Sequence, residues 1–266
     1  ASDVYKRQHD VKDKVAIVTG GGSGMGQIIA RRLVERGARV AIFDVNEAGM
    51  EETAAGSDRI TSYHCDISDR ATVDEAVSRV AAELGPVELL AHAAALMPSH
   101  KLADETNEGM ERLFQINYFG TVYMVKAVLP GMLERNSGRI IAFGSIAGHA
   151  PVPNMGAYCA TKSAVNMYME VLHNELRHTD VHTHLVCPPA VNTPLIDQTL
   201  ATDSPGSIIE SKKSGRLADP EKIIDAIDKG VAKGKSIIYP GEARLLLLWH
   251  ALFPGLWWKT VLKFED

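Results

Sequence analysis

The sequence is poor in features that mark several other classes of protein. Its three cysteines, Cys65, Cys159 and Cys187, form neither a disulfide framework nor a CxxC metal motif. This usage fits a reducing compartment, so we expect the protein in the cytoplasm. The formal net charge is −5, which provides no excess of Lys and Arg for binding nucleic acid.

Long apolar runs and metal-binding patterns are also lacking. The apolar stretch 245–258 is interrupted by His250 and Pro254, and it is shorter than the roughly 20 residues that cross a bilayer. The histidines at 178, 182 and 184 should be divided between a helix end, a loop and a strand. We therefore expect no metal site.

The length and composition suit one α/β domain with a large core, since 45% of the 266 residues are hydrophobic. Residues 1–11 lack periodicity and are expected to be disordered or non-native, so the single domain should cover 12–266. Short apolar runs alternate with helical patterns, which is typical of a doubly wound parallel sheet. The expected strands are 15–18, 39–43, 60–64, 87–91, 139–143, 181–186 and 236–239. Long helices are expected at 106–135, where Pro130 should cause a kink or an early stop, and at 155–178.

A glycine-rich turn, T-G-G-G-S-G-M-G at 19–26, joins the first expected strand to an amphipathic helix. Glycine permits a sharp turn there and lets the backbone approach a pyrophosphate at the helix N-terminus. The second strand ends in Asp44, whose carboxylate can accept hydrogen bonds from a ribose and would repel a 2′-phosphate. The cofactor should therefore be NAD rather than NADP. The alternatives are a flexible surface turn and, for Asp44, a turn residue or helix N-cap.

Tyr158 and Lys162 are spaced Y-x-x-x-K, which places both side chains on one face of a helix. A neighbouring ammonium should lower the pKa of the phenol toward the physiological range, so that the tyrosine can exchange a proton. Ser145 could then hold the substrate oxygen. An isolated match of this kind more often marks a half-buried ring beside a solvated charge.

Together with Asn117 and Asp66, these motifs resemble the short-chain dehydrogenase/reductase family over residues 12–240, with its Rossmann-like fold. The resemblance implies that Tyr158 is the acid and base, Lys162 also binds the nicotinamide ribose, Ser145 orients the substrate oxygen and Asn117 holds a relay water. Asp66 and Ile67 would border the adenine, and Val191 and Thr193 would contact the carboxamide. The implied cofactor site comprises Gly20, Ser23, Gly24, Met25, Gly26, Asp44, Asp66, Ile67, Tyr158, Lys162, Pro188, Val191 and Thr193.

Two departures from the family pattern are expected to alter cofactor affinity without abolishing activity. The chain has H-A-A-A at 92–95 where the family usually has N-N-A-G, and Pro189 replaces a usual glycine. The resemblance also implies that the two long helices pair across a four-helix interface, in a homodimer or homotetramer.

Two segments near the C-terminus are expected to enclose a substrate. Prolines and glycines break the segment 194–217, which is expected to be a mobile lid, with a plain surface excursion as the alternative. The arm at 242–266 carries Trp249, Trp257 and Trp258. It should pack on the substrate cleft or on a neighbouring subunit; a membrane-surface helix is the alternative that we do not favour.

These features predict an NAD-dependent oxidoreductase that interconverts a hydrophobic secondary alcohol and its ketone. Steroid, aromatic and lipid-like substrates all remain open. The rival hypothesis is a catalytically idle NAD-binding sensor or scaffold of the same fold, which the H-A-A-A segment would suit.

Overall fold

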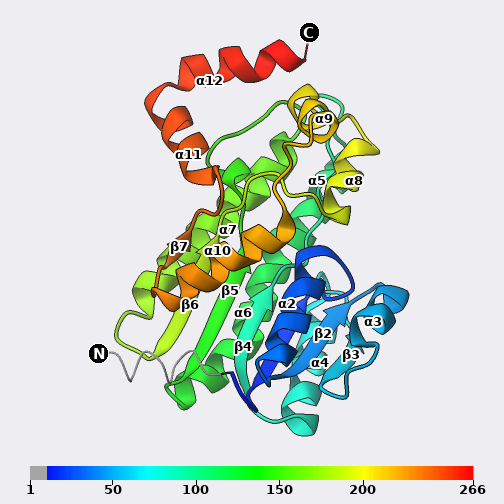
Figure 1. Cartoon of the computed structure of the whole chain (residues 1–266), viewed down its shortest axis with the longest axis vertical. Helices are drawn as coiled ribbons and strands as arrows, with labels where there is room; N and C mark the ends of the chain where they lie inside the picture. Colours follow the sequence, from blue (N-terminus) through cyan, green and yellow to red (C-terminus); the bar gives the residue numbers. More distant parts are fainter. Residues whose placement is uncertain (1–10, 266) are drawn as a thin grey trace.

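A seven-stranded parallel sheet, in the order β3-β2-β1-β4-β5-β6-β7, forms the centre of the molecule (Figure 1). The computed structural model describes residues 11–265, so most of the expected N-terminal segment lies outside the described residues. The strands are β1 (Val15–Thr19), β2 (Arg39–Asp44), β3 (Ile60–His64), β4 (Val87–His92), β5 (Gly138–Phe143), β6 (Val181–Val186) and β7 (Ile237–Ile238). The predicted doubly wound sheet is confirmed. Its strands are short β-branched runs because helices cover both faces.

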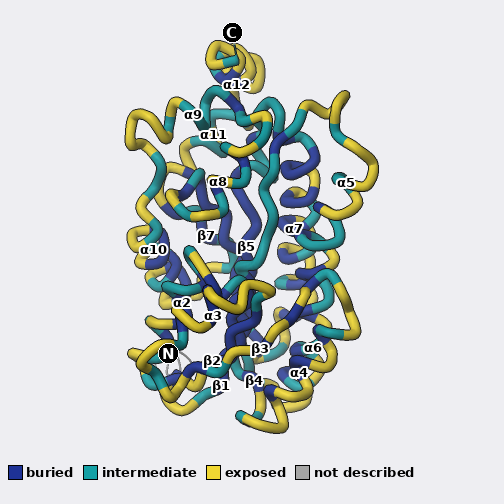
Figure 2. The backbone as a smooth tube through the Cα atoms, turned by 90° about the vertical axis from the view of Figure 1, so that its right-hand side faces the viewer, coloured by how far each residue is buried: buried dark blue, intermediate teal, exposed yellow. Residues whose placement is uncertain are grey.

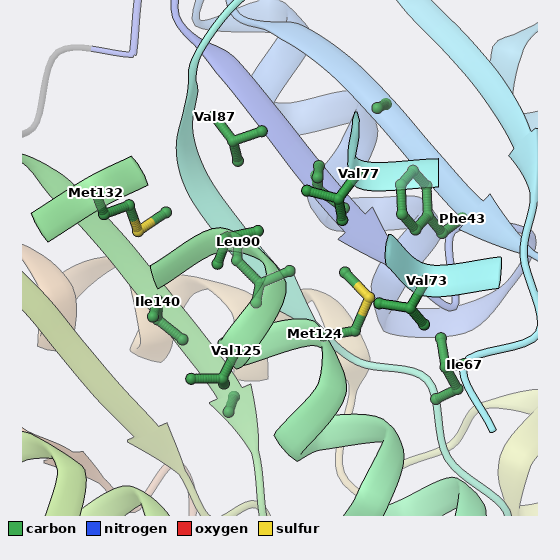
Figure 3. Close-up of a cluster of buried hydrophobic side chains, with 14 of the residues drawn as sticks. Phe43, Ile67, Val73, Val77, Val87, Leu90, Met124, Val125, Met132 and Ile140 are labelled. Carbon is green, nitrogen blue, oxygen red and sulfur yellow. The ribbon is translucent and has the colours of Figure 1, made fainter. Parts of the chain in front are cut away.

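One face of the sheet packs against α4 (Arg70–Glu83), α6 (Gly120–Glu134) and α7 (Gly156–Glu175), and the other against α2 (Gly24–Glu35), α3 (Glu47–Ala54) and α10 (Pro220–Ala232). Figure 3 shows part of the buried cluster that fills the first face, with Val73 and Val77 of α4, Met124 and Val125 of α6 and Leu90 of β4. Figure 2 shows the sheet as the buried interior of the molecule. This core fixes the strand ends from which the site residues project.

The expected helix at 106–135 contains one wider turn. It is built from α5 (Asn107–Phe114), the π-helical turn η1 (Gln115–Phe119) and α6. The predicted early stop at Pro130 is wrong, because α6 continues through it to Glu134. The π-helical turn is the departure that matters for the site, since it carries Asn117.

Four short helices lie beyond the sheet, at the upper end of the molecule in Figure 1. They are α8 (Pro194–Leu200), α9 (Gly206–Lys213), α11 (Ala243–Leu252) and α12 (Pro254–Val261), and the 3-10 turn η3 (Leu262–Phe264) follows. The segment 194–217 is thus partly helical, and its motion as a lid stays a prediction.

Candidate active site

A cavity of about 360 Å³ lies where β1, β2, β3 and β4 end. Nine of the residues predicted to bind the cofactor line it: Gly20, Ser23, Gly24, Met25, Gly26, Asp44, Asp66, Ile67 and Thr193. The turn requires its glycines, because Gly20 has φ +67° and a Cβ on Gly26 would lie 2.1 Å from the Gly20 carbonyl oxygen. The tight turn leaves the backbone open to the cavity, as a pyrophosphate site needs.

Asp44 closes the glycine turn and faces the same cavity. Its Oδ2 accepts a hydrogen bond from Gly22 N–H at 2.9 Å, and its Oδ1 accepts one from Asn46 N–H at 3.0 Å. The N-cap of α3 is Asn46, so Asp44 is not the helix cap that was its alternative interpretation. Beside Asp44, Val45 and Asn46 line the cavity without adding a positive charge.

The H-A-A-A segment is held by a contact that the sequence did not predict. The Thr19 hydroxyl oxygen accepts hydrogen bonds from the N–H groups of Ala93 and Ala94, at 3.1 and 3.2 Å. It lies 2.9 Å from His92 Nδ1, to which it can donate its own proton. Burial lowers the pKa of His92 to about 3, so the ring is neutral. Thr19 and His92 thus support the end of β4 without the family's usual asparagines.

A second cavity, of about 270 Å³, adjoins the first. The two share Met25, Ala93, Ala95, Thr193 and Leu195 as lining residues. Ser145, Tyr158 and Lys162 line the second cavity, as do the predicted cofactor residues Pro188 and Val191. The other lining side chains are mainly apolar and include Met97, Ile146, Val152, Met155, Ile196, Ile208, Leu246, Trp249, Trp257 and Val261. The nucleotide end and the apolar end of the site therefore meet at the five shared residues, and the catalytic residues lie in the apolar end.

The predicted catalytic residues converge on this second cavity from two elements. Ser145 follows β5, and its side chain forms a hydrogen bond with Tyr158. Tyr158 and Lys162 project from α7 and are both buried. Lys162 Nζ donates a hydrogen bond to the Phe143 carbonyl at 2.8 Å, and it lies 5.8 Å from the centre of the Tyr158 ring. The three side chains form one polar cluster in a mainly apolar wall.

Burial controls the proton affinities in this cluster. It raises the pKa of Tyr158, and the hydrogen bond from Ser145 only partly opposes the change. It also lowers the pKa of Lys162 to about 8. The predicted lowering of the Tyr158 pKa is wrong, because removal from water destabilises the phenolate more than the Ser145 contact stabilises it.

Asn117 is buried in the π-helical turn, where it ties three segments together. Its Oδ1 accepts from Leu96 N–H at 2.8 Å, and its Nδ2 donates to the Leu96 carbonyl and to Thr161 Oγ1 at 2.9 and 3.1 Å. Thr161 in turn donates to the Tyr158 carbonyl at 2.8 Å. The side-chain donors of Asn117 are thus already used within the protein. It holds the Tyr158 helix against the loop after β4, and the relay water stays a prediction.

The comparisons with known proteins agree with this geometry. The family model described as short chain dehydrogenase matches residues 14–204. Estradiol 17-beta-dehydrogenase 11 of Rattus norvegicus is 28% identical over 94% of this chain and 83% of its own length. Epidermal retinol dehydrogenase 2 of Mus musculus is 30% identical over 84% of this chain and 74% of its own length.

A solved structure extends the comparison to the fold. A short chain dehydrogenase/reductase from Burkholderia phymatum in complex with NAD superposes with a TM-score of 0.83, at 26% identity, over 93% of this chain and 96% of its own. The family model covers most of the chain, including the glycine turn and the Ser145, Tyr158 and Lys162 cluster. The chain therefore belongs to the short-chain dehydrogenase family.

Proposed function

We propose that this protein is an NAD-dependent dehydrogenase that interconverts a hydrophobic secondary alcohol and its ketone. The observation that carries the proposal is the placement of Ser145, Tyr158 and Lys162 in an apolar cavity that adjoins the glycine-turn cavity. Tyr158 can then exchange a proton at the substrate oxygen, beside the cavity where the nucleotide would bind.

The residues around the first cavity fit NAD. The glycine turn leaves room for the pyrophosphate against the N-terminus of α2, and Asp44 can accept hydrogen bonds from an unphosphorylated ribose. The related Burkholderia phymatum structure contains NAD. When bound, NAD supplies the hydride acceptor for alcohol oxidation, and its reduced form supplies the donor for the reverse reaction.

The residues of this chain supply the proton transfer. In reduction the Tyr158 hydroxyl protonates the carbonyl oxygen of the substrate, and in oxidation its phenolate removes the alcohol proton. Ser145 places that oxygen beside Tyr158 through its own hydroxyl. Lys162, held by the Phe143 carbonyl, keeps a cation near the phenolate, where it stabilises the charged form.

The apolar walls support a hydrophobic substrate. Trp249, Trp257 and Val261 line the same cavity as Ser145 and Tyr158. Two relatives carry the names of estradiol and retinol dehydrogenases, and both named compounds are bulky hydrophobic alcohols. The idle-sensor alternative is less well supported, because the catalytic cluster is complete and Thr19 with His92 supports the altered segment.

A screen of hydrophobic secondary alcohols with NAD, followed by the absorbance of NADH, tests the proposal. We expect turnover of at least one steroid or aromatic alcohol. Tyr158→Phe should reduce turnover by about a thousandfold and leave NAD binding within about twofold, since the ring remains. Turnover by Tyr158→Phe within tenfold of the parent enzyme would contradict the role of Tyr158. NAD binding without turnover of any alcohol or ketone would favour the sensor.

A further inference from the structure

The arm, defined as residues 242–265, has one face that packs onto the substrate cavity. Trp257 is 5% exposed, and its Nε1 donates a hydrogen bond to the Pro151 carbonyl at 2.8 Å. The Glu265 carboxylate accepts from Gly206 N–H at 2.9 Å and from Asn154 Nδ2 at 3.4 Å. The arm is therefore attached to the rest of the molecule through this inner face.

The outer face of the arm is apolar and exposed. The described residues include fourteen exposed large hydrophobic side chains, and eight of them belong to the arm. These are Leu245, Leu248, Leu252, Phe253, Leu256, Trp258, Leu262 and Phe264. Phe264 also lines the substrate cavity, and the other seven make up the outer face. They lie at one extreme of the molecule, where Figure 2 shows α12 as largely exposed. A patch of this kind is typical of a surface that contacts another apolar phase.

The charges on the arm indicate which partner that is. Arg244, Lys259 and Lys263 are exposed, and none of them forms an ion pair with another described residue. Of the two acids, Glu265 is engaged with Gly206 and Asn154, which leaves Glu242 at the start of the arm. An apolar surface bordered by cations thus lies on a protein whose net charge is −5.

We propose that the outer face of the arm binds an anionic lipid surface. Leucines and Trp258 would enter the headgroup boundary, and the three cations would meet lipid phosphates and carboxylates. A second copy of the chain fits less well, because a two-fold contact would set the cationic patch against itself.

The arm would lie on the lipid surface rather than cross it. Within residues 11–265 no single helix has the length and hydropathy to span a membrane. Helix α11 and the segment 254–264 meet those criteria only as a pair, and they are bent by 117°. Leu246, Trp249 and Trp257 of the same helices line the substrate cavity. Docking would therefore place that cavity next to the lipid, from which a hydrophobic alcohol can enter.

Co-sedimentation with vesicles tests the proposal. The full chain is mixed with vesicles of phosphatidylcholine alone or with phosphatidylserine added, and the pelleted fraction is measured. We expect more pelleting with the anionic vesicles and less at high salt. Leu245→Glu with Leu252→Glu should reduce lipid binding by about tenfold or more. The matched control, Leu102→Glu with Ala103→Glu, puts two charges at exposed apolar side chains outside the arm and should pellet like the parent protein.

Several outcomes would overturn the proposal. A parent protein that stays in the supernatant with anionic vesicles would do so, as would equal losses in the arm variant and the control. Sedimentation velocity without lipid tests whether a second copy of the chain covers the outer face instead. If the parent protein is a dimer and the arm variant is a monomer, the outer face is a subunit contact. Alcohol turnover in detergent should be retained by the arm variant, so loss of lipid binding is distinguishable from loss of the proposed activity.

Discussion

At Tyr158, the apolar surroundings disfavour the phenolate that alcohol oxidation requires. Burial raises the pKa of this phenol, so near neutral pH Tyr158 is mostly protonated. It can donate a proton readily, but little of it is in the phenolate form that accepts one. The nearby lysine is itself desolvated, with its pKa lowered to about 8. The direction of the reaction should therefore respond strongly to pH.

The first prediction concerns that response. Ketone reduction needs the protonated phenol, so its kcat/KM should be nearly flat between about pH 6 and 8. Alcohol oxidation needs the phenolate, so its kcat/KM should rise by about tenfold per pH unit over the same range, because the pKa lies above it. Initial rates in both directions measure the two profiles. A flat profile for oxidation would show that proton removal does not limit the reaction, contrary to this account.

Asp44 offers a second prediction. Asp44→Ala combined with Val45→Arg removes the repulsion of a 2′-phosphate and adds a cation for it. We expect the ratio of kcat/KM for NADP to that for NAD to rise by about tenfold or more. Val45→Arg alone is the control and should change the ratio less, since the carboxylate remains. A parent enzyme that already prefers NADP would refute the assignment of Asp44.

The secondary-structure elements that depend on neighbouring residues in the sequence were predicted well. The strands at 60–64 and 181–186 were placed with their observed bounds, because β-branched and aromatic residues favour strands. The π-helical turn was not predicted, since it accompanies contacts between Asn117 and Leu96, which lies 21 residues earlier. The partnership of Thr19 and His92, 73 residues apart, had no local signal either. Burial of Tyr158, which reverses the expected pKa shift, likewise depends on tertiary packing.

The arm gives a prediction at the scale of an element. Trp257→Ala removes a buried ring and its hydrogen bond to Pro151, and it should lower the free energy of unfolding by about 3 kcal/mol. It should also raise KM for a hydrophobic alcohol while the affinity for NAD stays unchanged, because Trp257 lines the second cavity and not the first. Urea denaturation and steady-state kinetics measure the two effects. Trp258→Ala, at a neighbouring ring that is 39% exposed, is the control and should change both values little.

For the whole molecule, we propose that α5, α6 and α7 form a subunit interface. The support is the exposure of Met167 and Val171 on α7, and of Phe119 and Leu133 on the neighbouring helical run. Met167→Glu with Val171→Glu should shift the protein toward monomer in sedimentation velocity, because two charges would be buried in each half of the interface. Leu102→Glu, outside these helices, should leave the assembly unchanged. A parent protein that sediments as a monomer at micromolar concentration would exclude this interface.

The order of the two cavities along the chain has a consequence for biosynthesis. The residues that line the first cavity have all been synthesised once the chain reaches residue 198, whereas the second cavity awaits side chains between 242 and 264. Because nascent chains fold from the N-terminus, the nucleotide site can assemble while the substrate wall is still being made. A ribosome-bound chain arrested before the arm emerges should thus bind dinucleotide and yet lack a closed alcohol pocket. In each newly made molecule, the cofactor site would therefore form before the substrate pocket.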